Sequence, residues 1–520
     1  MNGYSIFSRS IFWVSFLLCL PGLFLAFANP LIQIPFFIFL YFLGLNVIAF
    51  HAAGKIEAFR WALLVSGTAY AATLYWILVP VYYYGHFPLI LAVFCPLLLG
   101  FVLGVFSSIY VVMVFMLQRR FSWFAMGLFG GAVWGFLEYT REYVLTGFPW
   151  LITAQAFSIW PGTIQAVSIV GSYGLAMVLA CAGIWLYQRN RYSVIAALVM
   201  IALFLGYGFF LPEDNFDGPS IDILIIQGNV DQEMKWEEDS QVKTVEKYKS
   251  LTLQGLRRHD PDLVVWPETA MPFYLQEQSR LSFMVLDFAQ HQGIDLITGA
   301  PAYEMLDDGK NFKLYNRAFW ISRQGYIQDH YDKERLVPFG EYTPWPDQLF
   351  FLNRLVAGPM DFSPGRATAP MEHENLALGM LICYEIIFSG LVRDRVQQGG
   401  NVLLNISNDA WFGRTSAPEQ HLHLSVLRAV EHGRFVVRAT NTGISAFINP
   451  AGNVYRKTPL FQEAILKDSV TLLDRKTIYN VWYWHINWSI VAISLSGLVL
   501  CLIRPFRSSS GKPFILDSTA

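Results

Sequence analysis

The feature that most constrains the fold is the uneven distribution of charge along the 520-residue chain. Residues 1–212 hold only 11 of the 76 Asp, Glu, Lys and Arg side chains, residues 477–520 hold 4, and residues 213–476 hold 61. A charged side chain is costly in hydrocarbon, so the two charge-poor parts suit a lipid environment. We therefore predict a multi-span α-helical membrane domain at 1–212, a water-exposed domain at 213–476, and a final span with a short tail at 477–520.

Apolar runs of about 20 residues, enough to cross a bilayer, occur seven times before the charged block and once after it. The predicted spans cover residues 10–28, 31–50, 61–80, 88–117, 122–140, 163–187, 192–211 and 483–503. The first run also has the features of a signal peptide that ends at residues 26–28. Its length, and the second span that follows at once, favour an uncleaved helix.

Positive charges mark one side of these spans. Lys and Arg precede the first span and follow the second, fourth, sixth and eighth, whereas the opposite short connections hold only Arg141. Because cytoplasmic loops carry the excess of Lys and Arg, this pattern predicts that both termini are cytoplasmic. In a bacterium, the chain is then a multi-pass protein of the inner membrane, and its charged domain is periplasmic.

A small charged group, Glu138, Arg141 and Glu142, stands at the end of the fifth predicted span. Its helical spacing favours charge pairs that anchor the helix at the membrane interface. The alternative is a contact with lipid headgroups.

Composition excludes several classes of protein. The net charge of −2 shows no basic excess, so we expect no nucleic-acid partner. A hydrophobic share of 54% excludes a disordered chain, and five cysteines in 520 residues exclude a disulfide scaffold.

The charged block alternates apolar strand-like runs with helical patterns, which predicts a layered α/β fold. The predicted strands are 221–227, 263–266, 296–298, 317–321, 376–383, 402–406, 435–439 and 445–449, and the predicted helices are 236–257, 279–291, 389–398 and 417–432. Ser416 and Glu419 have the spacing of a capping box, and Gly433 follows the last helix. Residues 317–333 read as a hairpin that turns at 323–325.

One cysteine stands apart from the others. Cys19, Cys95, Cys181 and Cys501 lie in predicted spans, where a thiol is usually an apolar filler. Cys383 is alone in the charged domain, at the end of a strand, where α/β folds place reactive groups. A buried filler is the alternative for a lone cysteine.

A thiol nucleophile needs a base and a group that stabilises an oxyanion. Glu268 follows Trp266 and Pro267 at the end of another strand, and Lys333 ends the predicted hairpin. Taken singly, each is more simply a solvated charge. Together, Glu268, Lys333 and Cys383 have the order of the nitrilase-superfamily triad.

With these flanking motifs, the chain closely resembles the bacterial apolipoprotein N-acyltransferases over nearly its whole length. The matching motifs are Gln227-Gly228-Asn229, Trp266-Pro267-Glu268, the stretch from Lys333 to Tyr342, Cys383-Tyr384-Glu385, the stretch from Asn405 to Phe412, and the stretch from Arg438 to Gly443. The resemblance implies a nitrilase-like αββα sandwich for the charged domain. It also implies a ping-pong acyl transfer without a cofactor, which is the last step of lipoprotein maturation.

In the implied reaction, Cys383 attacks the sn-1 ester of a phospholipid, often phosphatidylethanolamine, and forms a thioester. The N-terminal amine of a diacylglyceryl-cysteine in an apolipoprotein then takes the acyl chain. Glu268 moves the protons, and Lys333 stabilises the thiolate and, with a backbone N–H near Tyr384, the oxyanion.

Further residues take roles from the same resemblance. Glu341 would position Lys333, Tyr384 and Glu385 would belong to the active site, and Trp236 and Trp411 would lie at the substrate or lid. Ordinary packing is the alternative for both tryptophans. Residues 345–362 form an apolar stretch that suits the membrane interface or, alternatively, covers the domain's own core.

Other mechanisms find little support. His421 and His423 form an H-x-H pair, but residues two apart on a helix point about 200° from each other, so we expect no metal site. A membrane-anchored nitrilase-type amidase would use the same triad. A transporter or receptor is less favoured because residues 61–117 carry no ionisable side chain in mid-span. We expect a monomer whose partners are membrane lipid, the phospholipid donor and the apolipoprotein acceptor.

Overall fold

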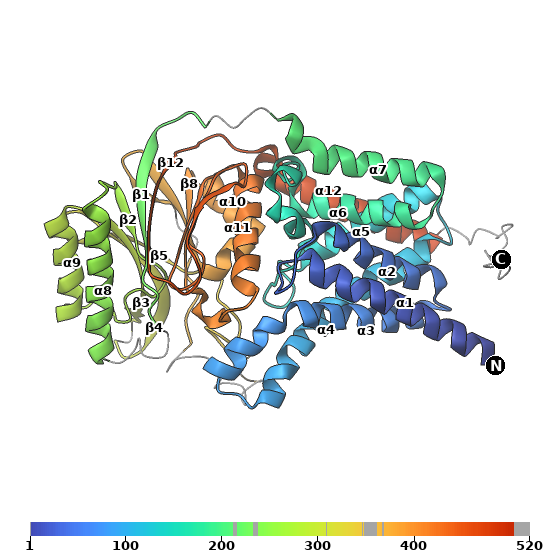
Figure 1. Ribbon diagram of the computed structural model, residues 1–520, viewed down its shortest axis with the longest axis horizontal. Coiled ribbons are helices and arrows are strands. Elements are labelled where there is room, and N and C mark those ends of the chain that lie inside the picture. Colours follow the sequence, from blue (N-terminus) through green and yellow to red (C-terminus); the bar gives the residue numbers. More distant parts are fainter. Residues whose placement is uncertain are drawn as a thin grey trace.

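A computed structural model describes residues 2–211, 216–231, 238–307, 309–345, 347, 361–366 and 369–503. A bundle of helices forms one side of the molecule and a two-sheet part forms the other (Figure 1). The helix α1 begins at the end of the bundle that lies away from the sheets (Figure 1).

The bundle contains a helix at each of the eight runs predicted to span a membrane. These helices are α1 (Asn2–Ala26), α2 (Ile38–His51), α3 (Lys55–Thr73), α4 (Leu89–Leu117), α5 (Trp123–Thr140), α6 (Val167–Tyr187), α7 (Arg191–Gly206) and α12 (Ile478–Ile503). By length and apolar composition, four segments in the described part of the chain can cross a membrane: α4, α6, α7 extended to Phe210, and α12. A fifth arises if α3 and the following Tyr75–Tyr84, bent by 60°, form one broken span. Eight complete spans therefore remain a prediction.

Within the described residues, the other part contains two six-stranded sheets. The first has the order β12-β1-β2-β3-β4-β5, and the second has the order β11-β10-β9-β8-β7-β6. The strands are β1 (Ser220–Gln227), β2 (Leu263–Val265), β3 (Asp295–Met305), β4 (Phe312–Ile321), β5 (Ile327–Asp332), β6 (Met371–His373), β7 (Leu376–Ile382), β8 (Val402–Ser407), β9 (Val436–Thr440), β10 (Ala446–Ile448), β11 (Val454–Lys457) and β12 (Ala464–Thr471).

Helices cover the outer face of each sheet. The helices α8 (Glu238–Leu256) and α9 (Arg280–Gln292) lie on the first sheet, and α10 (Ser389–Gln397) and α11 (Ala417–His432) lie between the second sheet and the bundle (Figure 1). Alternate residues of β1 show why the layers form: Ile223 and Ile225 pack between the sheets, whereas Leu224 packs under the outer helices. The predicted αββα sandwich is confirmed.

Three strands at sheet edges were not among the predicted ones. The strands β6, β11 and β12 were not predicted; β6 has only three residues, and β11 is mostly exposed. Their side chains need little apolar character because solvent reaches them, so the alternating signal is weak. The predicted hairpin is present as β4 and β5, with Arg317 opposite Asp332.

The predicted capping box is wrong, although α11 begins and ends where expected. Ser416 is helical in its backbone dihedral angles and makes no side-chain cap to the helix. Its hydroxyl instead accepts from the Gln420 side chain at 3.3 Å. Gly433 closes the helix in the left-handed conformation, as predicted.

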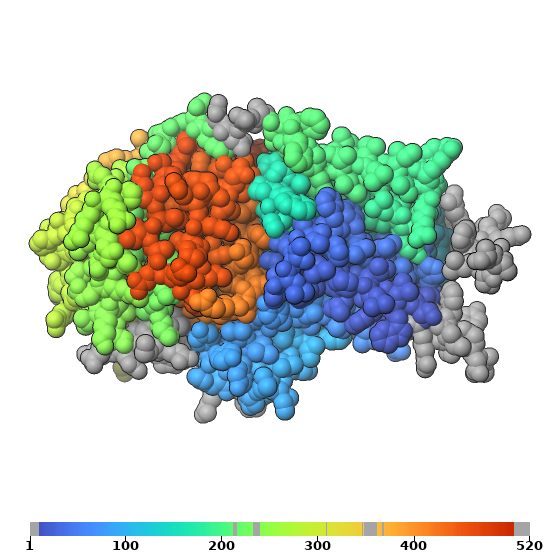
Figure 2. Space-filling view, in the orientation of Figure 1, coloured from blue at the N-terminus to red at the C-terminus, as the bar shows by residue number. Residues whose placement is uncertain are grey.

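The surface where the second sheet's helices meet the bundle is here called the seam, and Gln420 of α11 lies at its centre. The Oε1 atom of Gln420 accepts from the indole N–H groups of Trp76, at 3.1 Å, and Trp150, at 2.8 Å. Its Nε2 donates to the carbonyl of Ala28 at 2.9 Å. One buried amide therefore joins α11 to three separate segments of the bundle, and Figure 2 shows the two parts in direct contact.

Two acidic side chains reinforce the seam from opposite sides. Glu142, from the bundle, accepts from the backbone N–H of Gly390 at 2.7 Å and from Tyr173 at 2.8 Å. Glu431, from α11, accepts from the backbone N–H of Ser172 at 2.7 Å and pairs with Arg428.

Both readings of the small charged group in the sequence are wrong, because Glu138, Arg141 and Glu142 are each no more than 3% exposed. Glu138 accepts from Thr153 and Trp134, and Arg141 donates to the carbonyl of Trp150. The charges hold the connection between α5 and α6 against the seam and do not face headgroups or solvent.

Candidate active site

Two carboxylates share one buried ammonium group beside the ends of the strands β2 and β5. Lys333, just after β5, is 1% exposed, and its Nζ lies 3.3 Å from Glu268 Oε1 and 2.8 Å from Glu341 Oε1. Glu268 follows β2, where Pro267 ends the ladder. The fold therefore brings together Glu268, Lys333 and Glu341, which the sequence separates by up to 73 positions.

Neutral donors complete the environment of the two carboxylates. The Nδ2 of Asn316 donates to Glu268 Oε1 at 2.7 Å and to Glu341 Oε1 at 2.9 Å. The backbone N–H of Asn408 donates to Glu268 Oε2 at 2.8 Å, and that of Val337 donates to Glu341 Oε2 at 2.7 Å. Each carboxylate is therefore held at both oxygens, which fixes its direction.

The charge on Lys333 is secured by its neighbours. Burial alone would lower the pKa of this lysine, but Glu341 and Glu268 raise the pKa above its ordinary value. The ammonium group therefore persists across the physiological pH range and supplies a fixed positive charge in a site of low polarity.

Cys383 lies directly after β7 in a strained backbone conformation. Its φ of 52° is in the left-handed region, which a residue with a Cβ seldom adopts. Burial raises the pKa of its thiol, and the charge of Glu268 raises it further, whereas Lys333 and a hydrogen bond with Ser407 oppose the rise. At neutral pH the resting group is a thiol, so attack by sulfur requires a base.

Glu385 holds two loops together from inside the protein. Its Oε1 accepts from the backbone N–H groups of Glu334 and Arg335 at 2.7 and 3.0 Å, and its Oε2 accepts from that of Ile382 at 2.7 Å. The loop after Lys333 is thus tied to the strand that ends at Cys383. Burial raises the pKa of Glu385 to about 7, and the backbone hydrogen bonds oppose this rise.

The aromatic residues expected near the site lie at the seam or outside the described residues. Tyr384 donates its hydroxyl to the carbonyl of Gly147 at 2.8 Å. Trp411 packs edge-on against Tyr84, with ring centroids 4.8 Å apart. Trp236 and most of the apolar stretch 345–362 lie outside the described residues.

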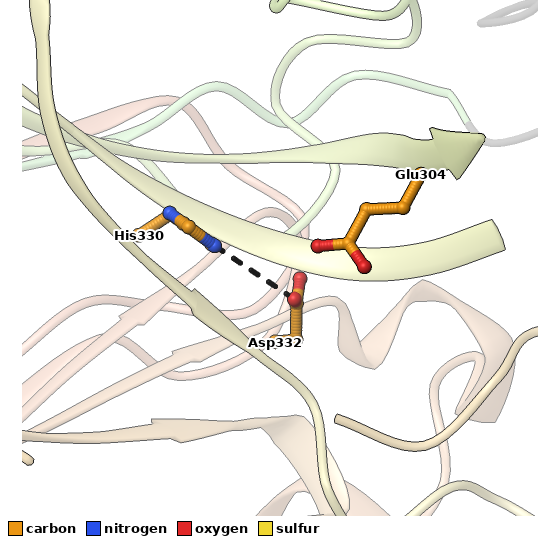
Figure 3. Close-up of side chains that lie close together, drawn as sticks. All are labelled: Glu304, His330 and Asp332. Carbon is orange, nitrogen blue, oxygen red and sulfur yellow. Dashed lines mark ion pairs between the residues drawn. The ribbon is translucent and has the colours of Figure 1, made fainter. Parts of the chain in front are cut away.

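His421 and His423 have different neighbours in the structure. His421 Nε2 lies 3.2 Å from the carbonyl oxygen of Cys383, whereas burial and Lys457 lower the pKa of His423 to about 4. The cluster with metal-ligand spacing among the described residues is elsewhere, at Glu304, His330 and Asp332 (Figure 3). Arg317 donates to both of these carboxylates, so an ion pair already accounts for their proximity.

Sequence reasoning missed Asn316 and Gly299. A plain turn at 323–325 would set residue 315 opposite residue 333. An irregularity between Trp320 and Ile321 shifts the register by one, so that Lys333 N donates to Asn316 O at 2.9 Å. The hairpin pattern therefore indicates the position of Asn316 to within one residue. A Cβ on Gly299 would lie 2.7 Å from Glu268 Cα, so β3 can approach the turn at Glu268 only with glycine there. Close backbone approach leaves no comparable signal in one sequence.

Comparisons with known proteins cover both parts of the chain. The family model described as "Apolipoprotein N-acyltransferase N-terminal domain" matches residues 21–185, and the model described as "Carbon-nitrogen hydrolase" matches residues 225–479. The apolipoprotein N-acyltransferase of Geobacter metallireducens is 36% identical over 469 residues, which are 87% of this chain and 88% of that protein. The one from Pseudomonas aeruginosa strain UCBPP-PA14 is 34% identical over 431 residues, which are 80% of this chain and 82% of that protein. A carbon-nitrogen hydrolase structure from Helicobacter pylori G27 covers 51% of this chain and 94% of its own, with a TM-score of 0.38 and 17% identity.

Proposed function

Because the chain belongs to the family of apolipoprotein N-acyltransferases, we propose that Glu268, Lys333 and Cys383 carry out its acyl transfer through a thioester on Cys383. The activity itself is N-acylation of apolipoproteins by an inner-membrane enzyme. The observation that supports the residue assignment is the buried Lys333 ammonium, hydrogen-bonded to Glu268 and Glu341 beside a strained Cys383.

In the first step, Glu268 removes the proton from the Cys383 thiol, and the sulfur attacks the ester carbonyl of a phospholipid at sn-1. The tetrahedral oxyanion is stabilised by Lys333 and by the backbone N–H of Tyr384. The bond between the carbonyl carbon and the glycerol oxygen breaks, and Glu268 returns its proton to that oxygen. The products are a thioester on Cys383 and a lysophospholipid.

In the second step, the N-terminal amine of a diacylglyceryl-cysteine attacks the thioester carbonyl. Glu268 takes a proton from the attacking nitrogen, the carbon–sulfur bond breaks, and Cys383 recovers its proton from Glu268. The same base thus serves both halves of a ping-pong reaction. Both oxygens of Glu268 are held by hydrogen bonds. This suits its role as base in both half-reactions, because neither requires the carboxylate to turn.

The seam supports a lipid donor. The nucleophile loop contacts the bundle through the Tyr384 hydroxyl, and several bundle helices are long and apolar enough to cross a membrane. A phospholipid such as phosphatidylethanolamine would therefore present its ester near the level of the seam. In this proposal the two-sheet part lies in the periplasm and both termini lie in the cytoplasm.

Mass spectrometry of the detergent-solubilised enzyme tests the residue assignment directly. After exposure to phosphatidylethanolamine alone, we expect an acyl adduct on the peptide that contains Cys383, and its loss when a diacylated lipopeptide is added. Cys383→Ser should carry no thioester, whereas Cys95→Ser should behave like the wild type. Free fatty acid without N-acylated peptide would favour an amidase, and full activity of Cys383→Ala would exclude covalent catalysis.

A further inference from the structure

Three buried polar side chains that the proposed reaction does not use lie next to the nucleophile. Asp409, His421 and Arg438 are each no more than 1% exposed. Arg438 Nη2 donates to Asp409 Oδ2 at 2.7 Å and lies 2.9 Å from His421 Nδ1. Its Nη1 donates to Asn405 Oδ1. Burying three polar side chains together costs free energy unless they are hydrogen-bonded to one another, so we expect a role for them other than packing.

Two arms of this network end on one atom, the carbonyl oxygen of Cys383. His421 Nε2 lies 3.2 Å from it, and Asn405 Nδ2 donates to it at 3.3 Å. These side chains come from α11 and β8, respectively. The peptide group that follows the nucleophile is therefore held from two directions by elements that do not carry it.

The partners of His421 determine how its ring is protonated. A carbonyl oxygen only accepts, so Nε2 carries the hydrogen. Burial and the neighbouring Arg438 lower the pKa of His421, which keeps the ring neutral. Nδ1 faces both Arg438 Nη2, at 2.9 Å, and Asp409 Oδ1, at 3.2 Å. In a neutral ring with its hydrogen on Nε2, Nδ1 can only accept, so its donor is Arg438, and Asp409 Oδ1 accepts from Ser407 instead. The hydrogen bonds then run in one direction, from the guanidinium through the imidazole to the Cys383 carbonyl.

This direction matters because the Cys383 carbonyl and the Tyr384 N–H belong to the same planar peptide group. In a trans peptide the two bonds point in opposite directions, so fixing the oxygen also fixes the hydrogen. Donation to the oxygen polarises the peptide and makes its N–H a stronger donor. A left-handed Cys383 is otherwise a costly conformation that needs such support.

We propose that His421 and Asn405 are positioning residues that orient and polarise the Cys383–Tyr384 peptide, so that its N–H can stabilise the oxyanion of the acyl-transfer reaction. Arg438 holds His421 in the required tautomer by donating to Nδ1, and Asp409 holds Arg438 in place. The inference rests on the proposed function and adds to it a mechanism for building the second oxyanion donor.

Two rates measured at the same sulfur separate this role from general structural support. Acylation of Cys383 by a 4-nitrophenyl acyl ester passes through an oxyanion, whereas alkylation by iodoacetamide does not. Both require an accessible, deprotonated thiol. Each rate is followed by mass spectrometry on the peptide that contains Cys383, in full-length enzyme in detergent.

Substitutions of His421 differ in reach. In His421→Asn, the amide still faces Arg438 but is too short to reach Cys383, whereas His421→Gln extends a donor toward the carbonyl. His423→Asn, two residues along α11, is the matched control for removing a buried imidazole. Asn405→Asp replaces the second donor with an acceptor of the same shape that can still pair with Arg438, and it provides an independent test if His421→Asn does not fold.

We expect His421→Asn and Asn405→Asp to slow acylation about 10- to 100-fold while alkylation stays within about twofold of the wild type. His421→Gln should recover most of the acylation rate, and His423→Asn should acylate normally. The inference is overturned if His421→Asn acylates at the wild-type rate, if acylation and alkylation fall together, or if His423→Asn has the same effect. Failure of the wild-type enzyme to acylate at Cys383 would instead overturn the proposed function.

Discussion

Replacing Glu341 with Gln tests whether the charge of Lys333 depends on its shorter carboxylate contact. The two groups are 2.8 Å apart and both are largely buried. At an effective dielectric constant of about 20, their attraction is about 6 kcal/mol, which corresponds to roughly a ten-thousandfold change in proton affinity. Without Glu341, burial opposes only the more distant Glu268, so the pKa of Lys333 should fall below that of free lysine.

The assay is the pH dependence of Cys383 acylation, measured as the pre-steady-state burst with a 4-nitrophenyl ester. In the wild type, Lys333 stays charged, and we expect no loss of rate from its deprotonation below about pH 10. In Glu341→Gln, an alkaline decline should appear at about pH 8–10. The rate at neutral pH should also fall about 10- to 100-fold, because a Gln amide cannot accept from both Val337 and Lys333.

Glu341→Asp is the matched control, because it keeps the charge and withdraws it by about one carbon–carbon bond length. It should lower the neutral rate without introducing the alkaline decline. An unchanged alkaline profile in Glu341→Gln would refute the electrostatic argument even if the rate fell, since Glu341 would then act only through position.

Three further predictions follow from buried contacts. The pKa of Glu385 is about 7 in the folded protein, so the unfolding free energy should fall as the pH rises from about 4.5 to about 7. Denaturant titrations at pH 5 and pH 8 measure this decline. In Glu385→Gln the decline should be smaller by roughly 3 kcal/mol. Gln420→Leu leaves two buried indole N–H groups without their acceptor, so it should lower the unfolding free energy by about 1–3 kcal/mol for each. The partly exposed Glu419→Leu should not lower it, and thermal unfolding in detergent distinguishes the two variants. Gly299→Ala should displace the turn at Glu268 and slow acylation about 10- to 100-fold, and an unchanged burst rate would contradict the close approach.

The sequence predicted the parts of the fold that depend on long-range composition and strong periodicity. The division between a helical bundle and a two-sheet part, the parallel strands and the strand-end positions of Glu268 and Cys383 follow from patterns over many residues. Edge strands such as β11 were missed because an exposed strand need not alternate.

The sequence could not predict most hydrogen bonds between residues that are far apart in the chain. Glu142 was interpreted as a charge at the membrane interface, yet it accepts from Gly390, nearly 250 residues away. His421 was set aside as one half of an implausible metal pair, yet its Nε2 lies 3.2 Å from the carbonyl oxygen of Cys383. Buried polar side chains need hydrogen-bond partners, but a single sequence does not indicate which residues those partners are.

The seam also limits how this protein can be divided. A continuous apolar core runs from bundle residues such as Trp150 and Phe157 to Leu422 and Val426 of α11. One residue of that helix, Gln420, is hydrogen-bonded to the bundle, and the next, His421, contacts the carbonyl oxygen of Cys383. The two-sheet part is therefore not an interchangeable module: a version excised as a water-soluble protein would expose this core and disturb the contacts that support Cys383, its proposed nucleophile. Recombination within the family would preserve activity only where both sides of the seam are inherited together.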